Sequence, residues 1–163
     1  MKTYVILVLG LGALAAHAAT PTACSTPEHR QFDFWIGDWQ VRKPDGGVAG
    51  INRITAEYGG CVIHEHYVTG RGYSGESLNI YDATRKLWHQ TWVDDGGLLL
   101  TLEGRWNGSS MVLEGLAPGP NGVPARQRIT WTPGADGSVR QLWETADAKG
   151  AWSVAFDGRY TKK

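Results

Sequence analysis

The chain has 163 residues, of which 42% are hydrophobic, and it carries 16 basic and 16 acidic side chains. This length and composition suit one globular domain with its own hydrophobic core, and they exclude a disordered chain. Zero net charge and the lack of any basic run exclude the electrostatic surface of a nucleic-acid-binding protein, so we expect no nucleic-acid partner.

The first 18 residues have the three parts of a secretory signal peptide. Lys2 supplies the positive start, an apolar run follows, and Ala16-His17-Ala18 is a small-residue cleavage signal. The apolar run is too short to span a bilayer. We therefore predict cleavage after Ala18 and a periplasmic or secreted protein with no membrane anchor. The alternative is a lipoprotein signal that ends at Cys24, although the residues before that cysteine do not fit it.

Two cysteines in an exported chain favour a disulfide. Cys24 and Cys61 are the only cysteines, and an oxidising compartment makes their pairing the expected state. A metal site is the alternative, but it needs more ligands at close spacing than two distant cysteines supply. We therefore predict the disulfide Cys24–Cys61.

After the first cysteine the sequence predicts one short helical segment and then strands. Residues 27–34 can form a helical turn or two, because Thr26 can cap the segment and Pro27 suits the first helical position. Beyond it, short alternating stretches rich in β-branched and aromatic residues recur regularly. The predicted strands are residues 39–43, 51–58, 61–69, 76–82, 88–94, 98–106, 110–116, 126–132, 138–145 and 152–160.

Turn signals rich in glycine, asparagine and aspartate separate these strands and join neighbours antiparallel. A meander of ten strands removes its exposed edges by closing on itself. The predicted fold is therefore all-β, a ten-stranded antiparallel up-and-down barrel of residues 36–163. Residues 19–35 form a helical plug at one end. A closed barrel needs no partner to protect an edge, so we expect a monomer or a weak dimer.

Three motifs carry a family resemblance: Phe32-Asp33-Phe34-Trp35-Ile36-Gly37-Asp38-Trp39, Gly60-Cys61-Val62-Ile63-His64-Glu65 and Trp88-His89-Gln90-Thr91-Trp92-Val93-Asp94. With them the chain resembles a family of small bacterial secreted proteins of unknown function. The resemblance runs to the closing Phe156-Asp157-Gly158-Arg159-Tyr160 and implies no particular activity.

A second resemblance concerns the start of the barrel. Gly37-Asp38-Trp39 resembles the Gly-x-Trp signature of lipocalins and other calycin barrels. In those families a basic residue of the last strand packs over the tryptophan, which implies this role for Arg159. A planar guanidinium can stack on an indole face. Gly37, Trp39 and Arg159 are therefore predicted to be structural.

Strand alternation predicts which side chains line the interior. We take the face of Cys61 as inward, because Cys61 must meet the plug, and this places Glu65 and Tyr67 inside. On the other strands the predicted inward residues are Ser77, Asn79, Tyr81, Trp88, Gln90, Trp92, Arg126, Arg128, Gln141 and Trp143.

This polar and aromatic lining favours a binding cavity, because enclosed polar groups need a partner, water or a ligand. Two interpretations remain open. Glu65 and Arg128 form a buried salt bridge, completed by the amides of Asn79, Gln90 and Gln141. Alternatively, Arg128 faces a ligand anion, and Trp92, Trp143 and Tyr67 enclose its aromatic or alicyclic body. Most other tryptophans are assigned to packing, with Trp106, Trp131 and Trp152 as wall or surface positions.

The histidines do not predict a metal site. His64 and His66 share the outward face of one strand, and His89 lies on another. Haem-binding barrels of the nitrobindin type resemble this architecture, but the chain from Leu98 onward contains no histidine to match their iron ligand. We expect neither a metal nor another cofactor.

Two functions from different classes follow. The first is an exported carrier or sensor of a small hydrophobic or aromatic molecule, bound by Glu65, Tyr67, Asn79, Gln90, Trp92, Arg128, Gln141 and Trp143. The second is a cofactor-free isomerase, cyclase or hydrolase with Glu65 as general acid or base. A tight Glu65–Arg128 pair would disfavour catalysis, because it would hold the carboxylate ionised. A third hypothesis is a filled barrel that serves as an interaction module.

Overall fold

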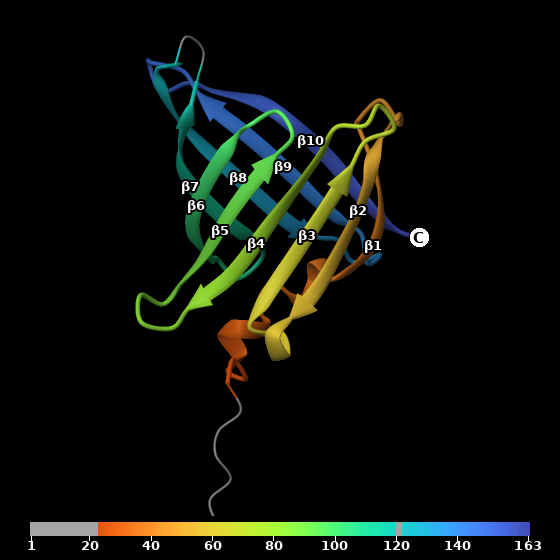
Figure 1. Cartoon of the computed structure of the whole chain (residues 1–163), viewed down its shortest axis with the longest axis vertical. Coiled ribbons are helices and arrows are strands. Elements are labelled where there is room, and N and C mark those ends of the chain that lie inside the picture. The colour runs from red at the N-terminus through yellow and green to blue at the C-terminus, as the bar shows by residue number, and fades with distance from the viewer. Residues whose placement is uncertain (1–22, 120–121) are drawn as a thin grey trace, which may run out of the picture.

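The computed structural model describes residues 23–119 and 122–163, and these form a closed antiparallel barrel of ten strands (Figure 1). Each strand pairs with its sequence neighbours, and β10 returns to pair with β1. The predicted fold class is therefore confirmed. The predicted signal peptide, residues 1–18, lies outside the described residues. Within these two ranges, no helix is long and apolar enough to cross a membrane.

The strands agree with the predicted ones to within a few residues at each end. Their bounds are β1 Gly37–Arg42, β2 Val48–Glu57, β3 Val62–Val68, β4 Ser74–Asp82, β5 Leu87–Asp94, β6 Leu99–Trp106, β7 Met111–Pro118, β8 Pro124–Pro133, β9 Val139–Ala146 and β10 Trp152–Lys162. Some ladders run beyond the alternating stretches, because turn residues at their ends still pair with the neighbouring strand.

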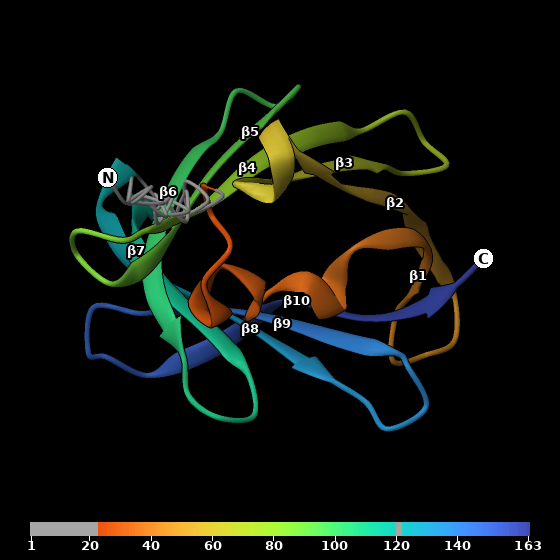
Figure 2. The same cartoon turned by 90° about the horizontal axis from the view of Figure 1, so that it is seen from below.

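The plug consists of two short 3-10 helices, η1 (Pro27–Arg30) and η2 (Asp33–Trp35), which lie across one end of the barrel (Figure 2). Thr26 does not cap η1 through its side chain; its Oγ1 instead lies 2.9 Å from Nδ1 of His29. The predicted disulfide is present. Cys24 is bonded to Cys61, which follows a third 3-10 helix, η3 (Tyr58–Gly60), so the bond ties the plug to the loop before β3.

An aromatic cluster fills the plug end of the barrel. The ring of Phe32 lies 5.0 Å from Trp35, 5.6 Å from Trp88 and 5.2 Å from Trp131, and all four side chains are buried. The prediction that Trp131 is a wall or surface position is wrong. Trp131 shares the inward face of β8 with Ile129, where it closes the core beneath the plug.

Trp39 has a basic partner, but it is not the one that the calycin resemblance implied. Nζ of Lys162 lies 3.9 Å from the centre of the Trp39 ring and donates a 2.6 Å hydrogen bond to the carbonyl of Ile36. Arg159 points outward and pairs with Asp136. The reason is the alternation of β10, which turns Tyr160 into the barrel and therefore Arg159 out of it.

Gly37 has a steric role in this closure. Its φ of +146° lies in the region that favours glycine, and a Cβ atom there would lie 2.1 Å from Nζ of Lys162. The Gly-x-Trp motif thus leaves room for the lysine above the indole.

Candidate ligand-binding cavity

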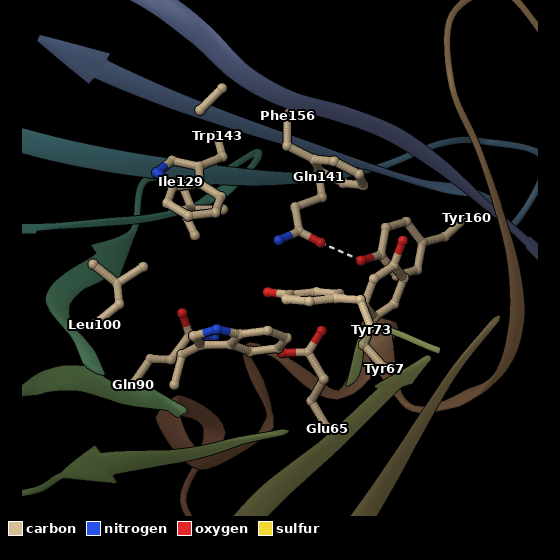
Figure 3. Close-up of a pocket in the computed structure, with 12 residues that line it drawn as sticks. Glu65, Tyr67, Tyr73, Gln90, Leu100, Ile129, Gln141, Trp143, Phe156 and Tyr160 are labelled. Carbon is tan, nitrogen blue, oxygen red and sulfur yellow. Dashed lines mark hydrogen bonds between the residues drawn. The ribbon is translucent and has the colours of Figure 1, made fainter. Parts of the chain in front are cut away.

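A cavity of about 190 Å³ lies inside the barrel, beyond the aromatic cluster of the plug end (Figure 3). Its wall comes from six strands and from the loop between β3 and β4. The lining residues are Glu65, Tyr67, Tyr73, Gln90, Trp92, Leu100, Ile129, Gln141, Trp143, Ala155, Phe156 and Tyr160. Exposed Ala155 lies at the rim, in the β-bulge between Val154 and Phe156.

Most residues predicted to line the interior do point inward. Six of the eight predicted ligand contacts line the cavity: Glu65, Tyr67, Gln90, Trp92, Gln141 and Trp143. Asn79 also faces inward, but it is fully buried behind the wall, where it supports Ser77 and Gln90. Arg128 is the exception.

The placement of Arg128 in the cavity is wrong. Its guanidinium lies on the outer face, where it donates to Oε2 of Glu144 at 2.9 and 3.1 Å and lies 4.2 Å above the Trp152 ring. Arg126 is outside too. The inward face of β8 carries Gln127, Ile129 and Trp131 instead. The predicted Glu65–Arg128 pair therefore does not form, and no arginine of the described residues lines the cavity to face a ligand anion.

Glu65 is a buried carboxyl held by neutral donors. Its side chain is only 3% exposed. Nδ2 of Asn52 donates to Oε1 at 2.7 Å, and Oγ of Ser77 donates to Oε2 at 2.7 Å. Burial raises the pKa of Glu65 to about 7, against the smaller lowering by the two hydrogen bonds and by His64 on the outer side of the same strand. Near neutral pH, Glu65 therefore populates both protonation states.

Glu65 belongs to a hydrogen-bonded chain of side chains that we call the polar belt. Its members are Gln90, Asn79, Ser77, Glu65, Asn52, Tyr160 and Gln141, which come from β5, β4, β3, β2, β10 and β9. Nε2 of Gln90 donates to Asn79 at 2.8 Å, and Nδ2 of Asn79 donates to Ser77 at 2.9 Å. At the other end, the Tyr160 hydroxyl donates to Oε1 of Gln141.

The polar belt separates two parts of the interior. The ring of Tyr160 packs at 6.3 Å from Trp35 and 6.1 Å from Trp39, which belong to the plug-end core. Its hydroxyl belongs to the belt, through its hydrogen bonds with Asn52 and Gln141. Figure 3 shows the carboxyl of Glu65 and the amide of Gln141 turned toward the same space from opposite walls. The belt thus gives the cavity a polar floor.

Aromatic side chains form the walls, and polar neighbours fix their orientation. The Tyr73 hydroxyl and the Trp92 indole both donate to Oδ2 of Asp94, at 2.8 and 3.0 Å. The Trp143 indole donates to Oε1 of Gln127 at 2.8 Å. These partners lie in the strands or at their ends, so the strands themselves fix the orientation of the rings.

Sequence reasoning missed several residues of this site. Tyr73 lies in a predicted loop, and Phe156 follows a bulge that interrupts the alternation of β10. Asn52 and Leu100 alternate with polar or exposed neighbours on strands whose inward faces were not assigned. On β8, the inward face could have been recognised from Ile129 and Trp131, because two large apolar residues on one face of a strand indicate the side that faces the interior.

The predicted outward placement of the histidines is confirmed. Glu76 lies on the outer face between His64 and His66, with contacts of 3.1 and 2.7 Å, and His89 contacts Glu103 at 3.1 Å. Residues 23–119 and 122–163 contain no group of three or more potential ligands that could hold a metal ion.

Comparisons with protein-family models and with curated sequences add no relative. No model of a known protein family matches the chain, and no curated protein sequence matches it significantly. The resemblances noted in the sequence therefore stay predictions.

Proposed function

We propose that the protein is an exported carrier or sensor that binds one small aromatic molecule inside its barrel. The observation that carries this proposal is the cavity of about 190 Å³, with aromatic walls and a polar floor at one side. Such a combination is typical of small-molecule sites, in which apolar walls supply affinity and a few polar groups fix orientation. An enclosed apolar space of about 150 Å³ can hold benzene, so this cavity suits a single ring with a small substituent.

Export and the absence of a membrane anchor after cleavage at Ala18 belong to the same proposal. The disulfide Cys24–Cys61 fits an oxidising compartment outside the cytoplasm. We further propose that the functional protein is a monomer or a weak dimer, in keeping with a barrel that has no open edge.

The test is binding of single-ring probes to the mature protein. Benzyl alcohol, benzylamine and benzoate are titrated separately, with tryptophan fluorescence and NMR as readouts. At least one should bind with a stoichiometry of one. Ala155→Trp should weaken binding by tenfold or more, because Ala155 lies at the rim. The matched control is Val154→Trp, because Val154 is 62% exposed and does not line the cavity. Failure of all three probes to bind at millimolar concentration would overturn the proposal.

One observation favours a second candidate function. Glu65 is not paired with Arg128, and its pKa of about 7 suits a general acid or base at neutral pH. We propose, as the alternative, a hydrolase, isomerase or cyclase in which Glu65 exchanges a proton with a bound aromatic substrate. Phenyl acetate tests hydrolysis, and acetophenone in deuterium oxide tests proton abstraction. Turnover that Glu65→Gln abolishes would support catalysis. If neither substrate reacts faster with the protein than in buffer alone, the enzyme proposal fails and the carrier proposal remains.

A further inference from the structure

The cavity combines one carboxyl with no basic side chain. Its lining contains Glu65 but no lysine, arginine or histidine from the described parts of the chain. The remaining titratable lining groups are the phenols of Tyr67, Tyr73 and Tyr160. Burial raises the pKa of all three, and the negative charge of Glu65 or Asp94 raises it further, so they stay protonated. Ionised Glu65 is therefore the one charge that the cavity can present to a ligand.

The hydrogen bonds of Glu65 leave room for another donor. An ionised carboxylate has about four lone-pair positions. Asn52 and Ser77 occupy one position on each oxygen. Both partners are neutral, so they orient the carboxylate without balancing its charge. A buried charge without a counter-charge is costly, and a cationic donor would remove that cost.

The walls favour the same kind of ligand. Trp143 and Phe156 lie across the space into which Glu65 points (Figure 3), and Trp92 also lines the cavity. The face of an aromatic ring carries partial negative charge and attracts ammonium groups, while it repels anions. A second aromatic ring packs well between such walls.

We propose that the natural ligand is a compact aromatic amine, whose protonated nitrogen pairs with the Glu65 carboxylate and whose ring lies between Trp92 and Trp143. This inference rests on the proposed function and names its ligand class. The ligand donates to the free lone pairs of Glu65. A single ring with a primary or secondary ammonium close to it fits the volume of the cavity and complements the negative charge of Glu65.

Binding should therefore be linked to proton release. The three lining phenols, Tyr67 on β3, Tyr73 in the β3–β4 loop and Tyr160 on β10, stay neutral at physiological pH. His64 lies on the outer face. Glu65 is therefore the group of the cavity lining that changes its charge near neutral pH. Only the ionised form pairs with the ammonium. Because the pKa of Glu65 is about 7, benzylamine should bind up to about 30-fold more tightly at pH 8 than at pH 5.5. Benzyl alcohol should show little dependence on pH.

The experiment compares three probes of nearly equal size on the mature, disulfide-bonded protein. Calorimetric titration at pH 7.5 should rank benzylamine at least tenfold tighter than benzyl alcohol, with benzoate weakest. Titrations in two buffers of different ionisation enthalpy at pH 6 should show proton release with benzylamine only. Glu65→Gln should remove the preference for the amine, while benzyl alcohol binding reports that the variant still has its cavity.

The outcomes separate this inference from the proposed function. If benzyl alcohol or benzoate binds as tightly as benzylamine, the amine inference is overturned and the carrier proposal stands. If the preference for benzylamine persists in Glu65→Gln, the role of Glu65 is overturned. If none of the three probes binds, both proposals fail. The pH series on the wild-type protein decides the question even if Glu65→Gln does not fold, because a flat profile for benzylamine overturns the inference.

Discussion

At the scale of single residues, the central feature is a carboxyl whose two protonation states are both accommodated. Asn52 donates to Glu65 through Nδ2, while its Oδ1 is buried without a hydrogen-bond partner among the described residues. Rotation of this amide would present the oxygen to a protonated Glu65 as an acceptor. The same neighbour can therefore serve the charged and the neutral acid, which helps to explain why a lone carboxyl is tolerated inside the barrel.

The raised pKa of Glu65 predicts how stability depends on pH. The pKa of about 7 in the folded protein exceeds the ordinary glutamate value of 4.5, so the folded protein binds this proton more tightly than the unfolded chain. The stabilisation of the folded protein by this proton is complete below pH 4.5. It is lost as the pH rises through 7, which lowers the unfolding free energy by about 3 kcal/mol in total. Urea unfolding should therefore show lower stability at pH 8 than at pH 5, and Glu65→Gln should lack this part of the decrease. An equal decrease in both proteins would contradict the assignment.

Gly75 has a second residue-scale role, because it makes room for a cavity wall. A Cβ atom on Gly75 would lie 2.2 Å from Cζ2 of Trp92. Gly75→Ala should displace the indole and cost roughly 1–3 kcal/mol of unfolding free energy. Gly70→Ala is the control, since Gly70 has no neighbouring atom within 4 Å of that position. Thermal unfolding and the near-ultraviolet circular dichroism of the tryptophans measure both effects. Equal stability of the two variants would refute the steric argument.

At the scale of elements, alternation along a strand predicted the inward side chains correctly where one residue of that strand was already known to face inward. The pairing of Cys61 with the plug gave β3 its inward face, and Glu65 and Tyr67 followed correctly. On β8 the same reasoning failed, because two arginines were assigned to the interior although Ile129 and Trp131 alternate with them. Hydrophobic burial outweighs the prospect of a buried ion pair, since charged groups are costly to desolvate.

Other parts of the site depend on geometry that alternation does not contain. Asp94 ends β5 and orients both Tyr73 and Trp92, which requires the β3–β4 loop to lie beside that end. The bulge at Ala155 shifts the register of β10 and brings Phe156 into the lining. Loop placement and bulges are set by contacts between distant segments, so the strand pattern predicted the barrel but only part of its cavity.

The last strand carries a prediction of its own, because it supplies the cation that covers Trp39. Lys162 makes both a cation–π contact and a hydrogen bond to Ile36. Lys162→Ala should lower the unfolding free energy by roughly 0.5–1 kcal/mol, the usual range for an exposed cation–π contact. Arg159→Ala should have no measurable effect, since its partner Asp136 lies on the surface. Urea unfolding of the two variants compares them directly, and a larger effect at Arg159 would restore the role that the calycin resemblance implied.

At the scale of the whole molecule, the interior is divided by function along the barrel axis. The plug end is filled by Phe32, Trp35, Trp88 and Trp131, which belong to the apolar core. The polar belt follows, and the cavity lies beyond it. A barrel of ten strands encloses more volume than side chains usually fill. The plug reduces this volume from one side, so the remaining space is small and suits a small ligand.

The disulfide ties the plug to the loop before β3, and its removal is the final prediction. Cys24 and Cys61 are 37 residues apart, so the bond restricts the unfolded chain over the whole first part of the barrel. By the chain-entropy relation the bond contributes about 4 kcal/mol. Phe32 and Trp35 are completely buried, and burying such side chains stabilises by roughly 1.5–3 kcal/mol each. The double variant Cys24→Ala/Cys61→Ala should therefore still fold with its plug docked, but at markedly lower urea concentration. Reductant should shift the wild-type midpoint toward that of the variant and leave the variant unchanged. A loss below about 1 kcal/mol would show that plug packing alone holds this end of the barrel closed.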